Sequence, residues 1–422
     1  LLGDDYCVDQ DTKIVTKRPE NYCSNNENED CDNYVNCNTG VCSQATIEAR
    51  ETDSGCKPSK GSSTGCKPGY YVVDGNDAFL STHTDTVSKV YSCGDDGSCN
   101  DVTDSVVGFL KNADTTHATA IPYIVCDESH ACSVIQQPSE NSCSKAGTLI
   151  YSSGYKLCID STTPKDLEDL AADVSYLVAA SDYANNNFIN SDAANSFVIV
   201  KTDTLGNAIL VPQNARNYYA AKADKTVLTS ASDNVNGSLY KSNGTVCVVD
   251  TTTIGYLINA ASNDEGVPYI KCSATGTPDN GVDTNSCIAI NKPDSTKAVG
   301  ALINDGDYKL CIDASNVVSL TASKYLVDAH STSTFVSTSG IKNGYYVIVE
   351  IDADGNIIRR DQTEKKYIYA VTSSKQVYDK GDTNYTTAMC TVAADGNPSK
   401  LDESKASEYI LHKTTGDLVD YY

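Results

Sequence analysis

The chain has 422 residues, of which 40% are hydrophobic and 21% charged, and its 56 acidic residues outnumber 32 basic ones to give a formal net charge of −24. A surface this acidic repels nucleic acid and anionic membranes, so both are excluded as main partners. The apolar content is sufficient for packed cores, which excludes a disordered polyelectrolyte. No apolar run approaches the ~18 residues of a membrane-spanning helix, so no membrane insertion is expected.

The residue types favour a mainly β fold with few short helices. The chain has 27 Tyr and 5 Phe but no Trp, and Tyr, Val, Ile and Thr fit the pleated, half-buried surfaces of strands. Its 18 cysteines include no Cys-x-x-Cys pair, and its 5 histidines lie at no zinc-like spacing. These cysteines predict a disulfide framework made in an oxidising compartment, and therefore a secreted or cell-surface protein with no metal or cofactor.

Residues 1–68 form the first predicted unit, a small cysteine-rich module. They hold few apolar residues, and a short chain with a small core needs covalent bridges. Seven cysteines lie here: Cys7, Cys23, Cys31, Cys37, Cys42, Cys56 and Cys66. The sequence leaves their pairing open.

From residue 69 onward the sequence repeats itself. Five motifs occur twice in the same order, about 150 residues apart. They occupy 108–113 and 255–260, 121–126 and 267–272, 155–160 and 308–313, 176–179 and 325–328, and 197–200 and 346–349. This recurrence predicts tandem modules at 69–195 and 196–343, followed by a partial third module at 344–422. We expect the array to continue, because the third copy stops just before an expected cysteine.

The repeated motifs are expected to be strands, because they are β-branched or aromatic and are bounded by Gly, Asn, Asp or Pro. We align 70–73 with 345–348 as the opening strands of the first and third copies. Gly-Asn pairs at 206–207 and 355–356 predict hairpin turns. One helix is predicted at 163–172, with Thr163 as its N-cap and Pro164 in its first turn.

The repeat also predicts which cysteines pair. In the first copy we expect three bridges, Cys93–Cys99, Cys126–Cys132 and Cys143–Cys158. The second copy has only four cysteines, and we expect them to form two bridges, Cys247–Cys272 and Cys287–Cys311. Cys390 is aligned with Cys247, with its partner past the end of the chain.

Three N-glycosylation acceptors agree with an extracellular protein. They are Asn236, Asn243 and Asn384, followed by Gly-Ser, Gly-Thr and Tyr-Thr respectively. Such acceptors mark surface loops of secreted proteins, although they also recur by chance in chains rich in Asn, Ser and Thr.

No motif predicts catalysis, so an enzyme is not expected. The sequence has no Gly-x-Ser-x-Gly or His-Glu-x-x-His motif. Asp160 and Asp313 end repeated strands, where an acid is expected to form a turn instead of acting as a catalyst. The stretch 352–356 resembles the start of a calcium loop, but Ile357 and Thr363 stand where such a loop needs Gly and Glu, so it too is interpreted as a turn.

The tyrosines allow two readings. Four lie inside repeated motifs and are expected to pack in the core or across strands, namely Tyr123, Tyr155, Tyr269 and Tyr308. Others form doublets at 70–71, 218–219, 345–346 and 421–422. Adjacent residues of a strand face opposite sides, so one tyrosine of each doublet is expected to point outward and to be available for recognition.

Together these motifs resemble the scaffoldins of anaerobic gut fungi. The resemblance rests on 69–73, on the Cys-x5-Cys pairs at 93–99 and 126–132, and on the repeated Gly-Phe/Tyr-Leu-x-Asn-Ala and Tyr-Lys-Leu-Cys-Ile-Asp segments. It covers residues 69–422. Scaffoldins are long secreted repeat proteins whose modules act as cohesins. The resemblance therefore implies a non-catalytic scaffold that docks dockerin-bearing plant-cell-wall-degrading enzymes into a cellulosome.

This chain departs from a strict match, because its copies differ in cysteine count, and the resemblance carries over no binding residue. The alternative reading is a cell-surface adhesin or wall glycoprotein that binds carbohydrate through its tyrosines. Polysaccharide is therefore a second candidate partner.

Overall fold

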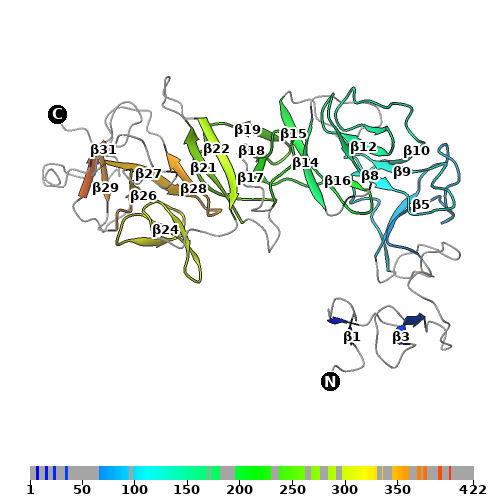
Figure 1. The fold of residues 1–422 in the computed structure, drawn as a ribbon, viewed down its shortest axis with the longest axis horizontal. Helices are drawn as coiled ribbons and strands as arrows, with labels where there is room; N and C mark the ends of the chain where they lie inside the picture. Colours follow the sequence, from blue (N-terminus) through cyan, green and yellow to red (C-terminus); the bar gives the residue numbers. More distant parts are fainter. Residues whose placement is uncertain are drawn as a thin grey trace. The chain divides into compact units, whose positions relative to one another are not determined.

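The structure is a computed structural model, shown as a ribbon in Figure 1. It describes residues 6–8, 15–17, 22–24, 34–36, 66–94, 98–168, 170, 173–180, 195–229, 237–261, 268–275, 284–290, 297–329, 335, 345–360, 368–371, 374–377, 388–391 and 399–400. Regular structure in these residues is β-sheet throughout, with no helix among them. The predicted mainly β fold is confirmed.

Contacts divide the chain into two units, of which the first comprises 1–174, 178–194 and 198–211, and the second 175–177, 195–197 and 212–422. Two small antiparallel pairs precede the repeats. They are β1 (Tyr6–Val8) with β2 (Val15–Lys17), and β3 (Tyr22–Ser24) with β4 (Tyr34–Asn36).

The first copy of the repeat is a series of strands arranged in three sheets. The strands are β5 (Gly69–Val73), β6 (Lys89–Cys93), β7 (Cys99–Asp101), β8 (Gly108–Lys111), β9 (Tyr123–Cys126), β10 (Cys132–Ile135), β11 (Leu149–Tyr151), β12 (Tyr155–Cys158), β13 (Pro164–Asp166), β14 (Val174–Ala179), β15 (Ser196–Thr202) and β16 (Ala208–Leu210). Two of the sheets are three-stranded, β5-β6-β7 and β11-β12-β13. In the third, which is part of a nine-stranded sheet, the strands of this copy run β10-β9-β8-β16-β15, and β14 also pairs with β15.

The second copy has the same strands in the same order. They are β17 (Ala215–Ala221), β18 (Ser238–Asn243), β19 (Cys247–Asp250), β20 (Gly255–Ile258), β21 (Tyr269–Thr275), β22 (Thr284–Ile290), β23 (Leu302–Asn304), β24 (Tyr308–Cys311), β25 (Val317–Ser319), β26 (Ser323–Asp328), β27 (Tyr345–Ile351) and β28 (Ile357–Arg360). Its large sheet runs β22-β21-β20-β28-β27-β26, and β23-β24-β25 form a three-stranded sheet. The five repeated motifs therefore lie on equivalent strands.

Strand pairing shows where each copy ends. β16 pairs with β8, and β28 pairs with β20 in the same way. The hairpins β15–β16 and β27–β28 therefore complete the first and second copies, which run 69–211 and 212–360 in place of the expected boundaries at 195 and 343. The third copy begins with β29 (Ile368–Val371) and β30 (Ala388–Thr391), and β31 (Ser399–Lys400) follows.

Our alignment of 70–73 with 345–348 is wrong. The counterpart of β5 is β17 and then β29, because the turn after each strand contains a residue with positive φ at the same position. These residues are Asp77, Lys225 and Lys375, with φ of 58°, 67° and 63°. Residues 345–348 lie on β27, which pairs with β26 and β28 as β15 pairs with β14 and β16.

The predicted helix at 163–172 is wrong, because the described residues of this range contain a short strand and no helix. Residues 164–166 form β13 and pair with β12, with Pro164 opposite Cys158. The carboxylate of Asp160 accepts the backbone N–H of Thr163, so the turn belongs to a β-hairpin. Leu167, which follows, is fully buried. Cross-strand pairing and burial of Leu167 outweigh the local helix signals.

Each copy has its own apolar core. In the first copy Val72, Leu110 and Ile124 belong to one cluster, and in the second Tyr256 and Leu310 belong to another, with further members in each. Close backbone contact in each large sheet requires glycine, since a Cβ on Gly108 would lie 2.2 Å from the Ala208 carbonyl oxygen and one on Gly255 would lie 1.9 Å from that of Ile357. The glycine that opens each repeated Gly-Phe/Tyr-Leu motif is thus explained.

Candidate functional site

The three bridges expected in the first copy are present. Cys93–Cys99 and Cys126–Cys132 each join neighbouring antiparallel strands, with Cα–Cα distances of 4.0 and 4.1 Å. Cys143–Cys158 attaches the segment before β11 to β12, with a Cα–Cα distance of 5.6 Å. Each of the three sheets of this copy is therefore crosslinked by one disulfide bond.

The pairing expected in the second copy is wrong. Cys272 is bonded to Cys287, with a Cα–Cα distance of 4.1 Å, and both Cys247 and Cys311 are free and buried. Cys272 and Cys287 face each other on β21 and β22, as Cys126 and Cys132 do on β9 and β10. The error lay in aligning Cys287 with Cys143, when it is the counterpart of Cys132.

Each free cysteine of the second copy has lost its partner. Ser242 lies opposite Cys247 in the strand register, at the position that Cys93 holds opposite Cys99. The Cys247 thiol donates instead to Oε1 of Gln213 at 2.9 Å. Burial raises the pKa of Cys247 to about 12 and also raises the pKa of Cys311. Neither thiol is therefore a reactive nucleophile near neutral pH.

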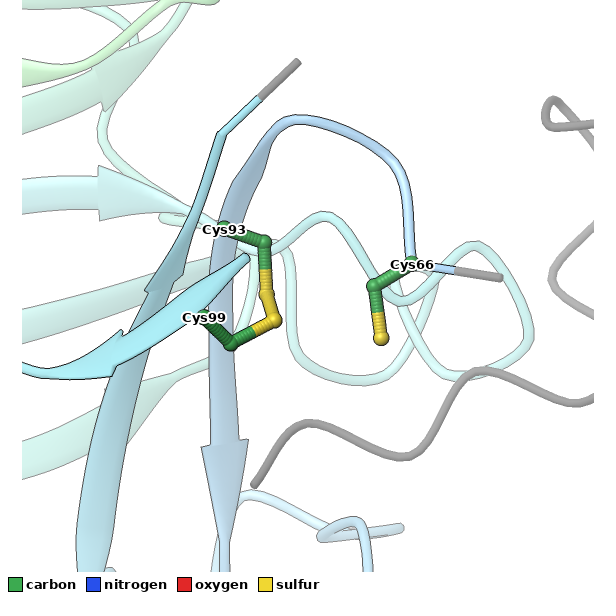
Figure 2. A group of neighbouring side chains, drawn as sticks. All are labelled: Cys66, Cys93 and Cys99. Carbon is green, nitrogen blue, oxygen red and sulfur yellow. A yellow bond between two sulfur atoms is a disulfide. The ribbon is translucent and has the colours of Figure 1, made fainter. Parts of the chain in front are cut away.

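Cys66 packs beside the first bridge of the first copy. Figure 2 shows its side chain directed toward the bonded Cys93 and Cys99, and the three sulfur atoms lie within 4.8 Å of one another. Cys66 is itself disulfide-bonded. None of the three therefore offers a thiolate to a metal ion. The other six cysteines of 1–68 have no described side chain.

Our alignment of Cys390 with Cys247 is wrong. Cys390 lies opposite Tyr369 in the strand register, and at the equivalent position of the first copy Tyr91 lies opposite Tyr71. Cys390 is therefore the counterpart of Tyr91.

Only one of the three expected glycosylation acceptors lies among the described residues. Asn243 is exposed at the end of β18, and its Oδ1 accepts the backbone N–H groups of Thr245 and Val246 at 2.9 and 3.0 Å. These bonds use the amide oxygen and not the nitrogen to which a glycan would attach. Asn236 and Asn384 lie outside the described residues.

The recurring acids form turns, as predicted. Asp160 Oδ1 accepts the N–H groups of Thr162 and Thr163 at 2.8 Å each, and Asp313 Oδ1 accepts those of Ser315 and Asn316 at 2.8 Å each. Burial raises the pKa of both carboxyls, but these hydrogen bonds outweigh it, so both pKa values are lowered. Such carboxylates stay ionised, which does not suit a general acid.

The stretch that resembles a calcium loop is also a turn. Asp352 Oδ1 accepts the N–H groups of Asp354 and Asn356 at 3.0 and 2.9 Å, and its Oδ2 accepts the Asn356 side-chain amide at 3.0 Å. Asp203 and Asn207 repeat these contacts in the first copy. The amide oxygens of Asn207 and Asn356 then accept the backbone N–H groups of Lys111 and Ile258, each at 2.8 Å.

The tyrosine doublets do not point outward in the way we expected. Tyr218 and Tyr219 are both buried, at 3% and 2% exposure, because β17 is covered on both faces. In the first doublet Tyr71 is fully buried and Tyr70 is half-buried. Tyr346 is also half-buried, and no side chain is described for Tyr345 or for the doublet at 421–422. The described tyrosines of these doublets belong to the packing.

The motif tyrosines pack in pairs, as predicted. The rings of Tyr123 and Tyr155 are 4.9 Å apart between centroids, and those of Tyr269 and Tyr308 are 5.0 Å apart. In the first copy a third ring extends the pair toward solvent, since Tyr151 lies edge-on to Tyr155 at 5.0 Å and is 36% exposed. No sequence signal marks Tyr151, because it lies outside both the repeated motifs and the doublets.

The first copy also has a small polar hollow next to the β11–β12 turn, the turn that follows Tyr151. Its volume is about 340 Å³, and it is lined by Lys111, Leu167, Glu168, Thr204, Leu205 and Gly206. We call this hollow, together with Tyr151 and Tyr155, the tyrosine hollow. Lys111 Nζ lies 3.5 Å from Glu168 Oε1.

Buried contacts hold the tyrosine hollow in place. The Tyr123 hydroxyl donates to the carbonyl oxygen of Gly206 at 2.9 Å, and Gly206 has a φ of 90° that favours glycine. A Cβ on Gly154 would lie 3.0 Å from Glu168 Oε2, so the β11–β12 turn lies against that carboxylate. Burial, then the neighbouring Tyr151 and Glu168, raise the pKa of Tyr155 to about 12. Tyr155 therefore remains a neutral phenol at physiological pH.

The first copy has two other polar features, a second hollow and a His-Asp pair. A hollow of about 660 Å³ has Phe109, Ser133, Gln136 and Glu140 among its lining residues. His117 Nδ1 lies 2.5 Å from Asp114 Oδ2, and the other oxygen of Asp114 accepts the N–H of Thr116. This pair closes a local turn.

Comparisons with protein-family models, with curated proteins and with solved structures found no match to this chain. Among the described residues no helix is long and apolar enough to cross a membrane. The features that bear on function are therefore the repeat, the bridges and the tyrosine hollow.

Proposed function

We propose that this chain is a non-catalytic extracellular scaffold in which each copy of one β module docks a separate protein partner. The resemblance of the repeated motifs to scaffoldins supports dockerin-bearing plant-cell-wall-degrading enzymes as these partners. The assembly would then be a cellulosome held together by modules of this kind.

The observation that carries the proposal is the repetition of one folded module. The first and second copies have equivalent strands in the same order and the same Asp-Asn turn, in which the asparagine is buried. Tandem copies of one fold multiply a binding function along a chain, and linked sites raise the effective concentration of bound partners. A catalytic role would need a reactive group in each copy. The recurring acids are used in turns, and the recurring cysteines are bridged or, in the second copy, also present as the buried thiols Cys247 and Cys311, whose pKa values are raised.

The two copies present different charges to such partners. Residues 69–211 have 19 acidic and 6 basic side chains, a net of −13, whereas residues 212–360 have 15 and 12, a net of −3. Electrostatic complementarity mainly sets specificity and association rate. We therefore expect the copies to differ in the partners they prefer.

The bridges support secretion as part of the proposal. Disulfides form and persist in oxidising compartments such as the extracellular space. The exposed Asn243 acceptor agrees with passage through the secretory pathway.

A binding experiment with the whole chain tests the proposal. The immobilised chain should retain dockerin-bearing enzymes, and added soluble dockerin should release them. A chain with both copies unfolded by reduction and alkylation serves as the control. Failure to retain any dockerin, or hydrolysis of a glycan by the purified chain, would refute the scaffold function.

A further inference from the structure

The framework beneath the tyrosine hollow is the same in both copies. Tyr269 and Tyr308 repeat the ring contact of Tyr123 and Tyr155. Residues 203–207 and 352–356 form the same turn, bonded to the strand at Lys111 in one copy and Ile258 in the other. Equivalent backbone positions can therefore be compared directly between the copies.

The side chains presented on this shared framework differ at four positions. Strand register places Tyr151 with Asn304, each opposite the second tyrosine of its pair. It likewise places Lys111 with Ile258. The remaining pairs are Glu168 with Thr321 and Leu205 with Asp354. The exposed ring, the ammonium group and the carboxylate of the first copy are thus all missing from the second.

The polar groups of the tyrosine hollow suit a ligand with hydroxyl groups. Lys111 donates hydrogen bonds and Glu168 accepts them, and the two groups stand side by side at 3.5 Å. Because their charges cancel, the pair favours neither a cation nor an anion. A hydroxyl can accept from one and donate to the other, and neighbouring hydroxyls of a sugar can use both at once.

The exposed ring and the size of the hollow agree with this chemistry. One face of a pyranose ring carries C–H groups with slight positive charge, which match the negative face of a tyrosine ring such as Tyr151. Small-molecule sites begin at about 300 Å³, and the hollow of about 340 Å³ is at that lower limit. A single sugar ring fits such a volume, whereas a polysaccharide would extend from it into solvent.

We propose that the tyrosine hollow is a carbohydrate-binding subsite for one pyranose ring, present in the first copy and absent from the second. Tyr151 stacks on the ring, and Lys111 and Glu168 bind its hydroxyls. This subsite is additional to the docking of protein partners and does not depend on it. A scaffold with such a subsite would contact polysaccharide directly.

Isothermal titration calorimetry on the whole chain tests the proposal. The ligands are hexasaccharides of β-linked glucose, of β-linked xylose and of mannose. We expect one site per chain with a dissociation constant of about 1 mM for at least one of them. Binding of the glucose or xylose oligomer identifies cell-wall polysaccharide as the source, and binding of the mannose oligomer identifies glycoprotein glycans.

Matched variants separate the subsite from other contacts. Tyr151→Ala should weaken binding at least tenfold, whereas Tyr151→Phe, which keeps the ring face, should bind within about threefold of the natural chain. Glu168→Thr, which introduces the residue of the second copy, should also weaken binding at least tenfold. Unchanged circular dichroism and urea midpoints establish that these variants are folded.

The second copy supplies a gain-of-function test. Asn304→Tyr, Ile258→Lys and Thr321→Glu combined should raise the stoichiometry from one toward two. The proposal is overturned if no hexasaccharide binds, if Tyr151→Ala binds as tightly as the natural chain, or if the natural chain already has two sites. Loss in Tyr151→Phe as complete as in Tyr151→Ala would overturn the stacking role.

Discussion

A single substitution should restore the bridge that the second copy lacks. Ser242 lies opposite Cys247 on β18 and β19, in the register that Cys93 and Cys99 occupy with a Cα–Cα distance of 4.0 Å. Ser242→Cys therefore places a second thiol within bonding reach of Cys247. We expect the bridge to form during oxidative folding.

The expected stabilisation follows from the length of the closed loop. A loop of about six residues restricts the unfolded chain by about 2 kcal/mol in the chain-entropy treatment. The reverse change, Cys93→Ser, opens a loop of similar length in the first copy and should cost about the same. The two substitutions thus form a matched pair of opposite sign.

Urea unfolding followed by circular dichroism measures both effects. At a slope of about 2 kcal/mol per molar urea, the transition of the second copy should move up by about 1 M in Ser242→Cys. The shift should vanish in a reducing agent, and Ser242→Ala, which adds no thiol, should show no such gain. A variant whose mass confirms the bridge but whose midpoint does not rise would refute this reasoning.

Three further changes test other parts of the structure. Iodoacetamide at about pH 8 should leave Cys247 and Cys311 unlabelled in the folded chain and label both after unfolding, because burial raises the pKa of each thiol. Mass spectrometry counts the labels, and labelling of either thiol in the folded chain would contradict its burial. Gly255→Ala should cost about 3 kcal/mol, since its Cβ would lie 1.9 Å from a carbonyl oxygen, whereas Gly75→Ala meets nothing within 4 Å and should change the urea stability by less than about 1 kcal/mol. Burial raises the pKa of Asp250, but hydrogen bonds from two threonines outweigh it and lower the pKa. Its contribution to stability is therefore present above about pH 4 and lost as the pH falls through the folded-state pKa, and urea titrations of Asp250→Asn should show a flatter acid limb or refute this assignment.

Local sequence patterns predict the strands and turns of this protein well. The repeated motifs become equivalent strands because β-branched and aromatic residues there alternate with turn-forming Gly, Asn and Asp. Bridges between cysteines that face each other across one turn, such as Cys126–Cys132, follow from spacing alone. The turn role of Asp160 is likewise a local property.

Features that depend on strand register could not be predicted in this way. Cys287 resembles Cys143 in chain order, and only the pairing of β21 with β22 shows that it corresponds to Cys132. Pro164 and Thr163 have local helix signals, but β12 binds this segment as a strand. Tyr151 has no motif of its own, and its exposure results from its place on Tyr155 at a sheet edge.

The hydrogen bond between the Asp-Asn turn and the distant strand governs the order in which each copy can fold. Lys111 and Asn207 are 96 residues apart, and Ile258 and Asn356 are 98 apart. During synthesis β8 therefore has an unpaired edge until about a hundred further residues have left the ribosome, which is a high-contact-order closure. In the first copy two bridges of sequence separation 6 can form early and hold short hairpins together until β16 has been synthesised. The described bridge of the second copy spans 15 residues, so we expect nascent second copies to depend more heavily on chaperones.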